Sequence, residues 1–141
     1  IGDLITPFRF STEKQDTTRF IVGGLLGQWA VWTSEAVKLH RECLEVQKRH
    51  RSPNLNLWEI NAQWTDANGA IFDAANGFSG CIAGIHEILR RQGLLEGIWC
   101  LDPNEGLSPK QKQEIDRVCR AYPNLSDDEF VRENLDSWLS G

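Results

Sequence analysis

The sequence lacks several features that would assign it directly to a class of protein. No Cys-x-x-Cys pair occurs, which argues against a structural zinc site. No apolar run approaches the roughly 20 residues of a membrane-spanning helix, and the first residues lack the charged-then-apolar pattern of a secretory signal. The 15 lysines and arginines are scattered and the net charge is −5, so the clustered basic surface of a nucleic-acid-binding protein is absent.

What the chain contains is enough apolar material for one compact unit. It has 141 residues, of which 40% are hydrophobic. The cysteines Cys43, Cys81, Cys100 and Cys119 are far apart, and we expect them to be reduced in the cytoplasm because the core is ample and no export signal occurs. Methionine is absent and residue 1 is Ile1, so we expect the sequence either to begin within a longer protein or to have been processed.

Hydrophobic periodicity predicts a mainly helical chain with two short strands near its start. Residues 5–10 are expected to be extended, and residues 28–32 suit a buried strand because they are rich in aromatic and branched side chains. One or two helical turns are predicted over residues 17–22. An amphipathic helix is expected from Ser34, and a longer one from Leu57, where apolar residues recur every three or four positions.

Capping signals place the remaining helices. Gly93 suits the left-handed end of the helix that precedes it. Ser108 and Pro109, with Gln111 close behind, have the order of a helix start, and residues 126–129 repeat this capping-box logic for a last helix.

Residues that could hold a metal are isolated. His86 and Glu87 begin like the helical motif of a zinc protease, but Arg90 stands where the second histidine is needed. We therefore predict no metal site and interpret His86 as a residue of the helix flank.

A polar cluster follows the first expected strand, and it consists of Ser11, Thr12 and Glu13. If the strand belongs to a barrel, this cluster lies on the C-terminal rim, where active sites occur. The alternative interpretation is a solvated loop.

The order of these segments resembles a known family over most of the chain. The features that match are the strand with its polar loop at 8–13, Gly23-Gly24, the strand at 28–32, the long helix from Ser34, the run Gly93-Leu94-Leu95-Glu96-Gly97 leading to Leu101-Asp102-Pro103, and the Leu-Ser-Pro helix start at 107–109. In this order the chain resembles the C-terminal portion of the dihydrodipicolinate synthase/N-acetylneuraminate lyase family.

The resemblance implies an α/β fold. Members are (β/α)₈ TIM barrels, and this chain would supply the last two strands of the barrel and then a mainly helical extension. Residues 1–50 would hold the last strands and helices, and residues 51–141 the C-terminal helical extension of the same domain. A complete barrel needs about 250 residues, so the remainder would lie outside this sequence.

The resemblance also implies a Schiff-base lyase or synthase of the class I aldolase type, acting on a 2-oxo acid such as pyruvate without a cofactor or metal. The catalytic lysine of the family would lie outside this chain, because Lys14 does not match its position. The implied substrate-binding residues are Ser11, Thr12 and Glu13 on the rim, and Trp29 and Ala30 beside the substrate carboxylate.

The alternative hypothesis is a non-catalytic helical module for assembly, in which the amphipathic helices of residues 57–92 form a subunit interface. The expected partners are the 2-oxo acid and further copies of the chain in a dimer or tetramer, with no nucleic acid and no membrane. A metal-dependent hydrolase is a third possibility, which the isolated histidines support poorly.

Overall fold

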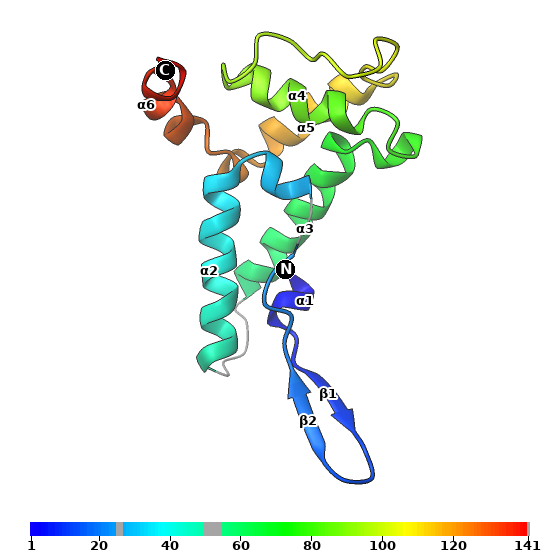
Figure 1. Cartoon of the computed structure of the whole chain (residues 1–141), viewed down its shortest axis with the longest axis vertical. Coiled ribbons are helices and arrows are strands. Elements are labelled where there is room, and N and C mark those ends of the chain that lie inside the picture. Colours follow the sequence, from blue (N-terminus) through cyan, green and yellow to red (C-terminus); the bar gives the residue numbers. More distant parts are fainter. Residues whose placement is uncertain (25–26, 50–54, 141) are drawn as a thin grey trace.

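Helices form most of the chain, as the hydrophobic periodicity predicts. The computed structural model describes residues 1–24, 27–49 and 55–140 (Figure 1). Their elements are α1 (Gly2–Ile5), β1 (Phe8–Ser11), β2 (Asp16–Arg19), the 3₁₀ helix η1 (Gly27–Ala30), α2 (Thr33–Arg49), α3 (Leu55–Ile71), η2 (Ala74–Asn76), α4 (Cys81–Arg91), α5 (Gln111–Ala121), η3 (Pro123–Leu125) and α6 (Asp128–Leu139). Among these helices, none is long and apolar enough to cross a membrane.

The predicted α/β class, with the last two strands of a (β/α)₈ TIM barrel, is wrong. The only sheet in the described part of the chain is an antiparallel hairpin of β1 and β2, in which Phe8 pairs with Arg19 and Ser11 with Asp16. The helical turns predicted over residues 17–22 are also wrong, because β2 lies there. Barrel strands are parallel and are joined through helices, whereas a short polar turn joins these two strands.

The strand predicted at 28–32 is instead the 3₁₀ helix η1 and the turn after it. The Thr33 hydroxyl donates to the Trp29 carbonyl at 2.8 Å, as in a helical turn, and Trp32 has a φ of 50°. Val31 and Trp32 are nevertheless only 1% and 2% exposed. The apolar composition therefore predicted the burial of Val31 and Trp32, which tertiary packing provides without a strand, whereas Ala30 is exposed.

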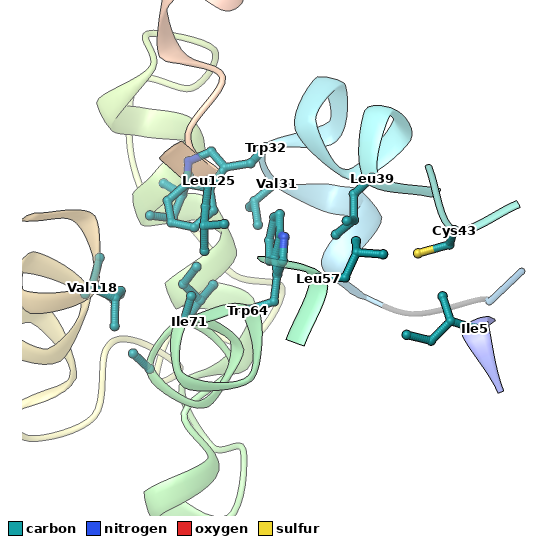
Figure 2. Packing of buried hydrophobic residues seen from close by; sticks show 14 residues of the cluster. Ile5, Val31, Trp32, Leu39, Cys43, Leu57, Trp64, Ile71, Val118 and Leu125 are labelled. Carbon is teal, nitrogen blue, oxygen red and sulfur yellow. The ribbon is translucent and has the colours of Figure 1, made fainter. Parts of the chain in front are cut away.

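One hydrophobic core runs through both halves of the sequence (Figure 2). Leu39 and Cys43 of α2 lie near Leu57 of α3, and the core continues past Trp64 toward Val118 of α5. The boundary proposed near residue 50 falls at residues outside those described, and the two segments share one core, as expected for parts of a single domain.

Close packing of α3, α4 and α5 depends on Gly84 and Gln111. A Cβ atom added to Gly84 would lie 1.9 Å from the Ile71 carbonyl oxygen, so only glycine fits there. The Gln111 side-chain amide donates to the Ile71 carbonyl at the end of α3 (3.1 Å) and to the Gly80 carbonyl before α4 (2.9 Å), so it links the three helices.

A buried carboxylate at Asp73 organises the link between α3 and α4. Its oxygens accept from the Asn76 amide at 2.6 Å, the Gly80 backbone N–H at 2.9 Å and the Ser108 hydroxyl at 2.5 Å. Burial alone would raise the pKa of Asp73, but these three hydrogen bonds outweigh it and lower the pKa below its ordinary value.

The predicted helix ends are confirmed in part. Gly93 has a φ of 80° just after α4, as the left-handed cap requires. The predicted start of the next helix at Pro109 is wrong, because α5 begins at Gln111 and its N-cap is Lys110. The Gln111 side chain does accept from the Ser108 N–H at 2.9 Å, and the Ser108 hydroxyl donates to Asp73.

Candidate functional site

Three of the residues predicted to bind substrate lie at the exposed tip of the hairpin. Ser11 ends β1, and Thr12 and Glu13 belong to the turn that follows. The Thr12 hydroxyl accepts from the Gln15 N–H at 3.1 Å and donates to the Gln15 carbonyl at 3.0 Å. These hydrogen bonds hold the turn itself, which agrees with the alternative interpretation as a solvated loop.

The other two, Trp29 and Ala30, lie in η1, just before the start of α2 and away from the hairpin tip (Figure 1). The Trp29 indole donates to the Gly24 carbonyl at 2.9 Å, and its ring meets His40 edge-on with 5.8 Å between the ring centroids. Trp29 lines a hollow of about 150 Å³, whereas Ala30 lines a different, larger groove. The structure therefore does not gather the five residues around one substrate.

Every lysine in the described part of the chain is exposed, including Lys14 in the hairpin turn. A Schiff-base amine needs a desolvated or strongly cationic setting to be nucleophilic at neutral pH. Because these lysines are exposed, none of them is desolvated.

The larger groove has a volume of about 580 Å³ and lies between the first half of α2, the end of α4 and helix α6. Its apolar wall consists of Ala30, Trp32, Val37, Leu89, Leu94, Phe130, Val131 and Trp138. Its polar wall consists of Thr33, Ser34, Lys38, Arg41, Gln92 and Asp127. Concave sites of this size, mostly apolar with a few polar groups, are typical of small-molecule binding.

Asp127 fixes α6 as one wall of this groove. Its carboxylate accepts from the Ser34 backbone N–H at 2.9 Å and from the Gln92 amide at 2.8 Å. The Ser34 N–H belongs to the first turn of α2, so Asp127 caps that helix from 93 residues away in the sequence. Sequence reasoning missed this site, because it assigned Asp127 only to the start of its own helix.

Two clusters of ion pairs join α5 to its neighbouring helices, one to α4 and the other to α3. Glu87 is 3% exposed and binds Arg90 (2.8 Å) and Arg91 (2.9 Å), while Arg91 continues to Asp116 of α5 at 2.6 Å. The hydrogen bond from Arg90 is the main reason why the pKa of Glu87 is lowered. Each acid in this cluster has a basic partner, so its role is to join α4 to α5.

The second cluster joins α3 to α5. Asp66 accepts from both terminal nitrogens of Arg117, at 2.7 and 2.8 Å, and from the Tyr122 hydroxyl at 2.6 Å. The bonds from Arg117 and then Tyr122 lower the pKa of Asp66 to about 2, and the same carboxylate raises the pKa of Tyr122. These carboxyl and phenol groups are therefore held in their ordinary charge states and are poorly suited to proton transfer at neutral pH.

The histidines and cysteines are the remaining side chains that could bind a metal or act as nucleophiles. Within residues 1–24, 27–49 and 55–140, no group of three or more His, Cys, Asp or Glu residues is arranged to hold a metal ion. All four cysteines are free, and burial raises the pKa of the Cys43 thiol, which makes it a poor nucleophile. The Nδ1 atom of His86 is buried and has no hydrogen-bond partner among the described residues.

Comparison of the chain with known protein families, with curated proteins and with solved structures finds no match.

Proposed function

We propose that this chain is a non-catalytic helical assembly module, which forms a homo-oligomer through its N-terminal hairpin. The observation that carries the proposal is the position of β1 and β2. The hairpin projects away from the helices, and within the described residues no third strand pairs with either edge (Figure 1). Unpaired edges of this kind are templates for pairing with another chain.

The hairpin also presents an aromatic face, on which Phe8 is partly buried and Phe10 is exposed. Its register places Phe8 and Phe10 on one face, opposite Arg19 and Thr17, and Phe10 is 56% exposed. A two-stranded hairpin in water is marginally stable unless a further strand or a helix packs on it. A partner that covers the Phe8–Phe10 face would supply the missing stabilisation.

A second copy of the chain fits this role through a two-fold contact between the β1 strands. If Phe10 lies opposite the partner's Phe10, the antiparallel register places Arg9 opposite the partner's Ser11. The neighbouring two-fold register would bring Arg9 against the partner's Arg9, and like charges directly opposite each other are destabilising. The first register buries the aromatic rings without that repulsion, so we favour it.

The test compares Phe10→Lys with a control on the other face, Thr18→Lys. Both positions are exposed strand residues of the hairpin, and only Phe10 belongs to its aromatic face. We expect light scattering after gel filtration to show an oligomer for the wild-type chain and for Thr18→Lys, and a monomer for Phe10→Lys. A wild-type chain that stays monomeric at its highest soluble concentration would refute the assembly role.

We also propose that the complete protein is a Schiff-base lyase of the dihydrodipicolinate synthase/N-acetylneuraminate lyase family, acting on a 2-oxo acid such as pyruvate in the cytoplasm. The support is the order of the C-terminal signals, in which Gly93 follows α4 and α5 follows Ser108. The free cysteines suit a reducing compartment. Because the described lysines are all exposed, the catalytic lysine would lie outside this chain.

This second proposal has a separate test. The longest natural polypeptide that contains the chain is incubated with pyruvate and borohydride, and its intact mass is measured. A single reduced adduct is expected with pyruvate and none with lactate, which has no carbonyl for an amine to attack. Absence of the adduct would refute the lyase proposal and leave the assembly role unaffected, because oligomerisation is measured independently.

A further inference from the structure

We propose that the groove between α2, α4 and α6 binds a small amphiphilic carboxylate, a molecule with an apolar body and a single anionic head. The groove is distinct from the hairpin, so this inference does not depend on the assembly role. Three properties of the groove support it: its aromatic wall, its unmatched positive charge and its limited exposed area.

The aromatic wall suits an apolar ligand body. Trp32 lies at the groove with only 2% of its surface exposed, while Phe130 and Trp138 are 45% and 48% exposed. Phe130 and Trp138 contact each other with 5.7 Å between ring centroids. Trp32 also has a φ of 50°, and such strained backbone positions in bulky residues are enriched at ligand sites.

The polar wall carries a positive charge, that of Arg41, for which the described residues supply no ion-pair partner. One stripe of α2 lines the groove with Lys38 and Arg41, three residues apart. Lys38 pairs with Glu35 at 2.5 Å, whereas Arg41 forms neither a hydrogen bond nor an ion pair with any described residue. The guanidinium group has the planar donor fork that a carboxylate accepts in bidentate fashion.

Asp127 does not cancel this charge for a ligand. It is the acidic residue of the described groove lining, and it is 6% exposed. Its carboxylate oxygens accept from the Ser34 N–H and the Gln92 amide. These donors hold Asp127 in the structural link between α6 and α2, so the exposed charge that faces an incoming ligand is positive.

The size of the groove favours a small molecule over a protein partner. A volume of about 580 Å³ is within the range of roughly 300–1,000 Å³ for small-molecule sites. A stable protein interface takes about 800 Å² from each partner. Trp32 and Val131 are only 2% and 4% exposed, so the half-exposed Phe130 and Trp138 are the large aromatic groups of the wall that a ligand could cover.

The experiment measures binding of decanoate and of decanol to the 141-residue chain by titration calorimetry. The two probes share an apolar body, and only decanoate carries the negative head. We expect one decanoate per chain, bound more tightly than decanol. Arg41→Gln should weaken decanoate binding about tenfold and leave decanol unchanged, because it removes one charge-assisted contact.

A matched control is Arg49→Gln, the same substitution on the same helix outside the groove, which should bind both probes normally. Trp138→Ala should weaken both probes, because it removes part of the apolar wall. Equal affinity for decanoate and decanol, or an Arg41→Gln variant with unchanged decanoate affinity, would overturn the proposal. A change of oligomeric state in Trp138→Ala would also overturn it, because a second copy would then occupy the groove.

Discussion

Substitution of Gly84 by alanine is the most direct test of how the helices pack. Gly84 lies inside α4 where that helix approaches the end of α3. The added Cβ would lie 1.9 Å from the Ile71 carbonyl oxygen and 2.6 Å from the Gln111 amide nitrogen. Neither distance is compatible with van der Waals contact, and the nearer atom belongs to the backbone. Helix α4 must therefore move away from α3, and the Gln111 hydrogen bonds must lengthen or break.

The expected cost follows from two losses and one gain. Overpacking in a core costs roughly 1–3 kcal/mol, and a buried hydrogen bond left unsatisfied costs a further 1–3 kcal/mol or so. Alanine returns up to about 1 kcal/mol through its higher helix propensity. We therefore expect Gly84→Ala to lower the free energy of unfolding by about 3 kcal/mol. At roughly 2–4 °C per kcal/mol, the melting temperature should fall by about 6–12 °C.

Gly69 provides the matched control, because it is also a helical glycine but has no atom within 4 Å of its added Cβ. Gly69→Ala should stabilise the chain by roughly 0.5–1 kcal/mol through helix propensity alone. Urea unfolding followed by circular dichroism measures both variants. If Gly84→Ala is as stable as Gly69→Ala, then α4 does not pack on the Ile71 carbonyl and the description of the three-helix contact is wrong.

Three further predictions concern single side chains. The pKa of Asp66 in the folded chain, about 2, lies below its ordinary value of 3.8, so Asp66 stabilises the fold above pH 3.8 and this stabilisation is lost as the pH falls toward 2. In thermal unfolding, the stability difference between the wild type and Asp66→Asn should therefore vanish over this pH range. A difference that stays constant with pH would contradict the prediction. Asp127→Ala should destabilise the chain by about 1–2 kcal/mol, because the cap on α2 is lost. The same hydrogen bond holds the start of α6 on α2, so proteolysis near α6 should become faster. An unchanged rate of cleavage would argue against this link between α6 and α2. Cys43, which is fully buried with a raised pKa, should resist iodoacetamide in the native chain and react only on unfolding; rapid native alkylation would show that the core near α1 is open.

The sequence predicted helices well where local rules determine the structure. The apolar spacing from Leu57 predicted α3, and the polar start at Ser34 matches the first turn of α2. Gly93 adopts the left-handed conformation that its position after an apolar helix indicates. In each case the relevant interactions lie within a few residues, so periodicity and capping preferences carry the information.

Prediction failed where distant residues decide the conformation. The aromatic run at residues 28–32 was expected to form a strand, but Trp32 packs on Trp64 of α3 and the chain turns there instead. The candidate groove could not be predicted either, since its walls come from three separate helices and the hydrogen bond between Asp127 and Ser34 joins residues 93 positions apart. A single sequence contains no local signal for such a contact, because Asp127 also suits the start of its own helix.

The arrangement of the molecule separates its two unsatisfied surfaces. The hairpin extends from one end and α6 lies at the other, with the core of α2 and α3 between them (Figure 1). Among the described residues, no third strand pairs with the hairpin, and no ion pair involves Arg41 of the groove, while Phe10 is 56% exposed. An unpaired strand edge is best covered by another polypeptide strand. A guanidinium group beside aromatic rings is best paired with a small anion. The two proposals are therefore tested by separate variants: Phe10→Lys should change the oligomeric state and not decanoate binding, and Arg41→Gln should do the reverse.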